Sequence, residues 1–130
     1  MASQREALFA FAKETFGTEP EFLWEKTPDA GVLRHADNRK WYGIVMTVQR
    51  KTLGLSGEGA VEILNVKADY LTGSFLRQQA GFLPAYHMNK EHWLTILLDG
   101  NVAFSQICEL LQESFSLTES KPKRKKEQKS

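Results

Sequence analysis

Between Tyr86 and Trp93 the sequence collects several side chains that are able to contact a ligand. Aromatic, imidazole, amide and ammonium groups follow one another there, in the residues Tyr86, His87, Asn89, Lys90, His92 and Trp93. Such a mixture is typical of nucleic-acid recognition, in which aromatic rings stack on bases, cations contact phosphates, and amides form hydrogen bonds with the polar edges of the bases. The alternative is structural: Tyr86 and Trp93 close the edge of the core while Asn89 and Lys90 form a turn.

A second set of candidate contacts is cationic and lies near the C-terminus. Residues 119–130 hold six basic and two acidic side chains, and the candidate phosphate contacts among them are Lys121, Lys123, Arg124, Lys125 and Lys126. Such a run can hold DNA or RNA by releasing counterions from the phosphate backbone. Its alternative role is that of a solvated tail that aids solubility. Residues 1–118 carry 11 basic and 14 acidic side chains, so we expect the folded part to be mildly acidic.

A third set of cations is expected to cluster around the turns that join the second, third and fourth strands, and it consists of Arg34, Arg39, Lys40, Arg50 and Lys51. If those turns act as wings on a duplex, these residues are the natural phosphate contacts. Solvated charges also belong at strand ends, so the residues alone leave both roles open.

The sequence predicts neither a metal site nor a catalytic site. His87 and His92 are five residues apart, which is not a standard zinc spacing, and no cysteine stands near them. Cys108 falls on the apolar side of a predicted helix, where a thiol behaves as a small inert hydrophobe. The run LGLSGEG lacks the Gly-Lys-Ser/Thr ending of a phosphate loop. We therefore expect no cofactor, no metal and no enzymatic activity.

Helix and strand patterns indicate which elements position these side chains. An S-x-x-E capping box at Ser3 begins an amphipathic helix that ends at Phe16, before Gly17. Two β-prone runs around Pro28-Asp29-Ala30-Gly31 predict a hairpin whose turn uses the left-handed φ available to glycine. A third strand over 41–48 alternates, with one face formed by Tyr42, Ile44, Met46 and Val48.

The second half of the chain continues with strands and helices. Residues 60–67 are apolar on both faces, which is typical of a central strand. Asp69 caps a helix that presents Leu71 and Phe75 and ends at Gly81. Strands are predicted over 82–87 and 92–98. A last helix carries a regular apolar stripe, which consists of Phe104, Ile107, Cys108, Leu111 and Phe115.

The resulting order is helix, four strands, helix, two strands, helix. Short turns imply antiparallel pairing, and helices with one apolar stripe must cover the sheet. We predict a single α+β domain over residues 1–118, with an antiparallel sheet of about six strands, and a disordered tail over residues 119–130. Charges interrupt every apolar run, so neither a membrane helix nor a secretory signal is expected. With a single cysteine, these features favour a cytoplasmic monomer.

The segment Pro84-Ala85-Tyr86-His87-Met88-Asn89-Lys90, followed by His92-Trp93, resembles the signature region of the MmcQ/YjbR family. That signature is a strand ending in Lys, an Asp-capped helix and a P-[AG]-Y-H-[ML]-[ND]-K-x-H-W run. Lys67-Ala68-Asp69 is similar to the family's Lys-Cys-Asp, so Lys67 joins the candidate contacts, whereas Tyr70 replaces a frequent Pro. The resemblance implies a CyaY-like fold and DNA binding through a double-wing motif.

From the residues and the resemblance together, we predict a non-enzymatic binding module with a regulatory role whose partner is DNA. The alternative is a protein-interaction or small-ligand module that uses the 86–93 hairpin and has no role with nucleic acid.

Overall fold

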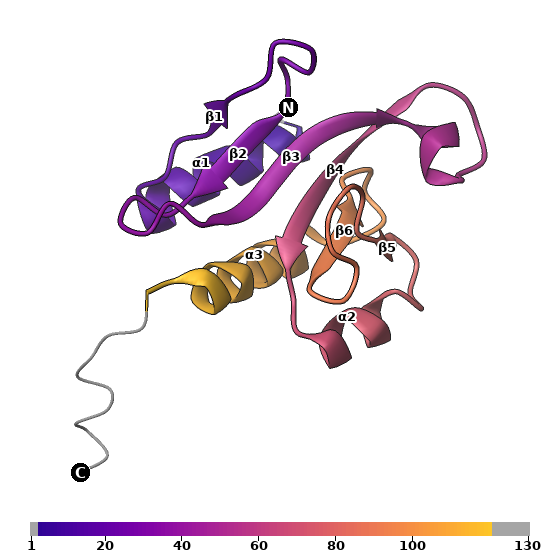
Figure 1. The fold of residues 1–130 in the computed structure, drawn as a ribbon. Coiled ribbons are helices and arrows are strands. Elements are labelled where there is room, and N and C mark those ends of the chain that lie inside the picture. The colour runs from indigo at the N-terminus through magenta and orange to yellow at the C-terminus, as the bar shows by residue number, and fades with distance from the viewer. Residues whose placement is uncertain (1–2, 121–130) are drawn as a thin grey trace.

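The structure, a computed structural model, describes residues 3–120, which form one six-stranded sheet and its flanking helices (Figure 1). The elements are, in chain order, α1 (Gln4–Phe16), β1 (Glu21–Phe22), β2 (Gly31–Arg34), β3 (Trp41–Gln49), the 3₁₀ helix η1 (Arg50–Leu53), β4 (Ala60–Lys67), α2 (Tyr70–Leu76), β5 (Phe82–Pro84), β6 (Trp93–Leu97) and α3 (Phe104–Thr118). Neighbouring strands all pair antiparallel, in the spatial order β1-β2-β3-β4-β6-β5. The predicted α+β class and order of helices and strands are therefore confirmed, with β4 inside the sheet as expected.

The first helix has the boundaries that its capping residues predict. The Ser3 hydroxyl accepts a hydrogen bond from the Glu6 backbone N–H at 3.1 Å, which satisfies one of the free donors of the first turn. At the other end Gly17 adopts a φ of 71°, and its N–H donates to the carbonyls of Ala12 and Lys13. A left-handed glycine is the usual way to end a helix, because it avoids a Cβ clash.

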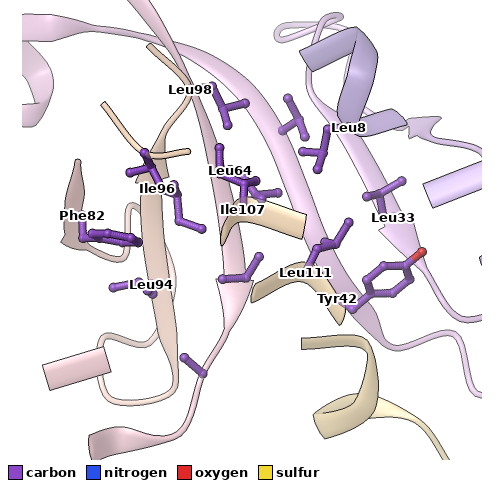
Figure 2. Packing of buried hydrophobic residues seen from close by; sticks show 14 of the residues in the cluster. Leu8, Leu33, Tyr42, Leu64, Phe82, Leu94, Ile96, Leu98, Ile107 and Leu111 are labelled. Carbon is purple, nitrogen blue, oxygen red and sulfur yellow. The ribbon is translucent and has the colours of Figure 1, made fainter. Parts of the chain in front are cut away.

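The main core lies between the sheet and the helices α1 and α3. Figure 2 shows Leu64 of β4 close to Ile107 and Leu111 of α3, with Leu8 of α1 and Leu33 of β2 farther along the same layer. All five residues belong to the largest fully buried side chains, and each is 0% exposed. Burying an aliphatic side chain of this size contributes about 1.5–3 kcal/mol, so this layer is the principal source of stability.

Two hydroxyl groups extend the predicted apolar stripe of α3. Ser114 is buried; its Oγ donates to the Tyr42 carbonyl at 2.6 Å and accepts from the Lys67 N–H at 2.8 Å. It thereby ties α3 to β3 and β4 at once. Thr118, at the end of the same helix, is also buried. The stripe is therefore longer than its apolar residues alone indicate.

The predicted face of β3 is wrong for Tyr42. The register between β2 and β3 shifts between Leu33 and Arg34, and this bulge turns Tyr42 into the helix-side core. The adjacent Gly43 also faces the helices, where a Cβ would lie 3.0 Å from Leu111 Cδ1. A bulge breaks the period of two on which the prediction rested. Beyond it, Ile44, Met46 and Val48 lie on the opposite face of the sheet, as the register with β4 shows.

Helix α2 begins as predicted and ends earlier. Asp69 accepts from the Thr72 N–H at 2.9 Å, but the helix stops at Leu76 and not at Gly81. Its predicted apolar pair is wrong as a buried face, because Leu71 is 76% and Phe75 63% exposed. Buried Gly73 and Leu76 face the interior of the protein instead. A helix of seven residues has only about two turns, and a Leu and Phe four apart do not determine which side packs.

The strands on either side of the 86–92 segment are shorter than predicted. β5 ends at Pro84, which has no N–H to continue the ladder, and β6 begins at Trp93. Residues 85–92 form a loop in which His87 has a φ of 60°, a value incompatible with a strand.

The hairpin between β1 and β2 is confirmed, but the predicted role of Gly31 in its turn is wrong. Gly31 is the first residue of β2 and is not among the residues of positive φ. Glycine is required there because a Cβ would lie 2.8 Å from Phe9 Cζ and 3.2 Å from Phe22 Cε1.

Most of the predicted tail, including Lys121, Lys123, Arg124, Lys125 and Lys126, lies outside the described residues. Within residues 3–120, none of the helices has the length and hydropathy needed to cross a bilayer.

Candidate functional site

A cavity of about 370 Å³ opens on the face of the sheet opposite to α1 and α3, which we call the open face. Its lining comes from four parts of the chain: the β1–β2 loop, β3, β4 and the 85–92 loop. The residues that line it are Trp24, Thr27, Trp41, Ile44, Met46, Asn65, Tyr86, His87 and Met88. We call this cavity the aromatic pocket.

The floor of the pocket is made by two paired strands. Ile44 of β3 lies opposite Asn65 of β4, and Met46 lies opposite Ile63. Because side chains alternate along a strand, these four residues share the open face. Asn65 is 1% exposed and is the polar member of this floor.

A closed ring of hydrogen bonds joins the floor to the loop above it. The Tyr86 N–H donates to Thr95 Oγ1 at 2.9 Å, Thr95 Oγ1 donates to Asn65 Oδ1, and Asn65 Nδ2 donates to the Tyr86 carbonyl at 3.2 Å. The carbonyl can only accept, so the amide atom that faces it must be the nitrogen. This ring fixes both the orientation of the Asn65 amide and the position of Tyr86.

Two aromatic pairs form the walls. The rings of Trp24 and Trp41 meet edge to face, with centroids 5.7 Å apart and an interplanar angle of 77°. The rings of Tyr86 and His87 meet at 4.1 Å and 79°. His87 reaches this position with a left-handed backbone conformation. In a residue that has a Cβ this conformation costs about 1–3 kcal/mol, and such strained residues are concentrated at functional sites.

The lining of the pocket contains no Asp, Glu, Lys or Arg. An ionised group that entered it would lose water without gaining a charged partner, which is unfavourable. The arrangement is therefore suited to hold a flat, uncharged molecule between aromatic rings, above one fixed amide.

The structure divides the six residues predicted between 86 and 93. Only Tyr86 and His87 reach the pocket. Asn89 Oδ1 accepts from the Glu91 N–H at 2.8 Å, and Lys90 Nζ donates to the Ala85 carbonyl at 3.1 Å. These two side chains bridge the loop in the way that the structural alternative expects.

Trp93 and Lys67 form a separate pair beyond the pocket. They are register partners at the ends of β6 and β4, and Lys67 Nζ lies 5.7 Å from the centroid of the Trp93 ring. His92 is exposed, and its carbonyl accepts from the Ala68 N–H at 2.9 Å. The loop is thus fastened to the link between β4 and α2 as well as to the sheet.

The predicted position of Arg39, Lys40, Arg50 and Lys51 at the turns between β2 and β4 is confirmed, but these turns do not bring the four cations together. The first two stand in the turn before β3 and the last two begin η1 after it, at opposite ends of the strand (Figure 1). The nine residues of β3, at about 3.3 Å each, separate the two pairs of cations by roughly 30 Å. They form two separate groups, and their predicted contact with DNA stays a prediction.

One of these cations, Arg39, shares an acidic partner with Arg34. Glu21 Oε1 lies 2.6 Å from Arg34 Nη2 and 3.9 Å from Arg39 Nη2. The hydrogen bond from Arg34 is the main cause that lowers the pKa of Glu21. Together residues 3–120 carry 11 basic and 15 acidic side chains, a net charge of −4.

A larger cleft of about 660 Å³ lies where the end of α1 meets the β2–β3 turn and the end of α3. Its cations, Arg34 and Arg39, already face Glu21, and three further acids line it: Glu19, Asp37 and Glu119. The lining therefore holds four acidic and two basic side chains, a net charge of −2. The aromatic pocket is smaller than this cleft, but its lining is uniformly without charged side chains.

Sequence reasoning missed seven of the nine lining residues: Trp24, Thr27, Trp41, Ile44, Met46, Asn65 and Met88. One signal was available, because Asn65 interrupts the apolar run of β4. A polar residue inside a central strand must find a partner when it is buried, and it marks a position worth examining.

Comparisons with known proteins cover nearly the whole described chain. A family model described as YjbR matches residues 14–117, a range that contains every residue of the aromatic pocket. The chain is 44% identical over 114 residues to the Bacillus subtilis protein YyaQ. The aligned residues cover 88% of this chain and 97% of YyaQ.

Two solved structures have the same fold. A crystal structure of a Pseudomonas syringae protein aligns with a TM-score of 0.86 and 39% identity, covering 88% of this chain and 98% of that one. The crystal structure of the Deinococcus radiodurans protein DR2400 aligns with a TM-score of 0.70 and 25% identity, covering 97% and 88%.

Proposed function

The chain belongs to the YjbR family, and from that premise we propose that it is a non-enzymatic binding module whose ligand site is the aromatic pocket. One observation carries the proposal: an apolar cavity converges on a single buried, oriented amide, that of Asn65. Small-molecule sites in proteins have this composition, with apolar and aromatic walls and a few placed polar groups.

The lining of the pocket supports binding over catalysis. Its titratable side chains are those of Tyr86 and His87, which meet edge to face. Acid–base or nucleophilic catalysis requires a nucleophile next to a base that a third group orients. The lining holds no carboxylate, thiol or ammonium group for such a set, whereas its rings offer area for van der Waals contact.

The three tryptophans provide a test with an internal control. Trp24 and Trp41 line the pocket, and Trp93 lies outside it. When small neutral aromatic compounds are added to ¹⁵N-labelled protein, the indole N–H signals of Trp24 and Trp41 are expected to shift while that of Trp93 stays in place. A library that moves none of the three signals, or moves all three equally, contradicts the proposal.

DNA binding is the second candidate, and the observation that favours it lies in the sequence. Six basic residues between positions 121 and 129 can neutralise phosphates, in agreement with the family resemblance. The described residues carry a net charge of −4, and four of the cations predicted as wing contacts are split between the two ends of β3. On this account the basic C-terminal run supplies the affinity for DNA, and the wings of the domain add little.

A further inference from the structure

We propose that the aromatic pocket selects an uncharged, planar heteroaromatic ring that presents a hydrogen-bond acceptor at its edge to Asn65. This inference rests on the proposed function and names the class of ligand that the pocket takes.

The hydrogen-bond inventory of Asn65 provides the first step. A side-chain amide has two N–H donors and one carbonyl acceptor. The Asn65 carbonyl oxygen is occupied by Thr95 Oγ1, and one N–H is occupied by the Tyr86 carbonyl. Within residues 3–120 the second N–H has no such partner among the side-chain hydrogen bonds, and Asn65 lines the cavity at 1% exposure. A buried donor without a partner costs about 1–3 kcal/mol, so a ligand acceptor placed there is favoured.

The charge of the lining provides the second step. Aromatic rings can also bind a cation through their faces, so a quaternary ammonium ligand is the obvious rival. The Asn65 oxygen is already occupied by Thr95, so this amide has only a donor N–H left to offer a ligand, and no carboxylate of the lining is present to attract a cation. The polarity of the site therefore favours a neutral acceptor over a cation.

The size and shape of the pocket provide the third step. Its volume of about 370 Å³ is near the lower end for ligand sites, which extend over about 300–1,000 Å³. The rings of Trp24, Trp41 and Tyr86 offer flat surfaces, and ring pairs are most favourable with centroids about 4.5–7 Å apart. A ligand of one or two fused rings satisfies both requirements.

Three probes of nearly the same size separate the relevant properties at neutral pH. Quinoline is uncharged and carries an acceptor, indole is uncharged and carries a donor, and N-methylquinolinium is a cation without an acceptor. Comparing probes leaves the protein unchanged, which matters because replacing Asn65 would also break its bonds to Thr95 and Tyr86.

The experiment is a titration of ¹⁵N-labelled full-length protein with each probe, followed through the indole signals of Trp24 and Trp41. We expect quinoline to bind about 2- to 12-fold more tightly than indole, the effect of one net hydrogen bond, and N-methylquinolinium to bind more weakly than quinoline. Quinoline should also shift the NMR signal of one Asn65 amide hydrogen, namely the hydrogen that does not face the Tyr86 carbonyl. Indole should shift the signal of neither Asn65 amide hydrogen.

The outcomes separate this inference from the proposed function. If indole binds as tightly as quinoline, or N-methylquinolinium binds more tightly, the inference is overturned while the pocket remains a ligand site. If the Asn65 amide signals do not respond to quinoline that is bound between Trp24 and Trp41, the inference fails as well. If no probe moves the two indole signals, the proposed function itself fails with it.

Discussion

At the scale of single residues, Thr95 is the link between the sheet and the loop that forms one wall of the pocket. It is 0% exposed, accepts from the Tyr86 N–H and donates to Asn65 Oδ1. Removing a buried hydroxyl of this kind leaves its donor and acceptor partners without a hydrogen bond, and that cost to stability exceeds the net energy of the bond itself. Thr95 is therefore a positioning residue for Tyr86 and, through it, for the pocket.

Replacing Thr95 with Val tests this role, since the two side chains have nearly the same shape. Thr95→Val leaves the Tyr86 N–H and the Asn65 carbonyl without their partner, and the free energy of unfolding should fall by about 1–3 kcal/mol. Hydrogen exchange at the Tyr86 amide should accelerate. Thr47→Val, at an exposed position of β3, is the matched control and should change little. Equal exchange in wild type and Thr95→Val would refute the role.

Tyr42 gives the protein a dependence on alkaline pH. Burial raises the pKa of Tyr42 to about 12, from an ordinary value of 10.0. Between these values the unfolded chain has lost the phenolic proton and the folded chain retains it. The neutral phenol of Tyr42 therefore makes its full contribution to the free energy of unfolding below pH 10. This contribution, about 3 kcal/mol in all, is lost as the pH rises to 12.

The variant Tyr42→Phe isolates this contribution from the titration of other groups. Urea unfolding at a series of pH values should show that wild type loses stability more steeply than the variant between pH 10 and 12. Parallel curves for the two proteins would show that Tyr42 ionises equally in both states.

At the scale of elements, the close contact between β2 and α1 depends on a glycine. A Cβ at Gly31 would lie 2.8 Å from Phe9 Cζ, whereas one at Gly73 of α2 would meet only the mobile end of Arg77, 3.3 Å away. Overpacking of a core costs about 1–3 kcal/mol, and Ala is better than Gly inside a helix by about 1 kcal/mol.

Two alanine variants should therefore change stability in opposite directions. Gly31→Ala should lower the midpoint of thermal unfolding, and Gly73→Ala should leave it unchanged or raise it. A Gly31→Ala protein as stable as wild type would show that β2 and α1 can separate without cost.

Periodicity and capping were sufficient to predict most elements. The ends of α1 follow from Ser3 and Gly17, and the central position of β4 follows from its two apolar faces. The errors arose where the chain departs from a regular period, at the bulge that redirects Tyr42 and in the short helix α2. No local pattern specifies a register shift, because it depends on the partner strand.

The pocket was less predictable than the fold, for a reason of scale. Trp24, Trp41 and Tyr86 come from three separate segments, and only the completed sheet brings them to one cavity. Each aromatic residue alone is typical of a core. The segment between β5 and β6 was predicted as a source of ligand contacts, but only Tyr86 and His87 of the six residues predicted there reach the pocket, while Asn89 and Lys90 hold the loop together.

At the scale of the whole molecule, charge separates an acidic domain from a basic C-terminal run. We predict that duplex DNA binds the full-length chain at low salt and that affinity falls with salt, with a slope in log units no steeper than about −5 for six cations. The chain without residues 121–130 should lose most of this affinity. Fluorescence anisotropy across a salt series measures both, and equal binding by the two proteins would assign the contacts to the domain.

The most direct test of the account fills the aromatic pocket. Met46 lies in its floor, and the next residue, Thr47, is exposed on the other side of the strand. Calorimetric titration with quinoline and indole should show binding to wild type and Thr47→Trp, and a loss of about tenfold or more in Met46→Trp, an energy of about 1.4 kcal/mol. Thermal unfolding confirms that both variants are folded. If folded Met46→Trp binds the probes as wild type does, the aromatic pocket is not the ligand site.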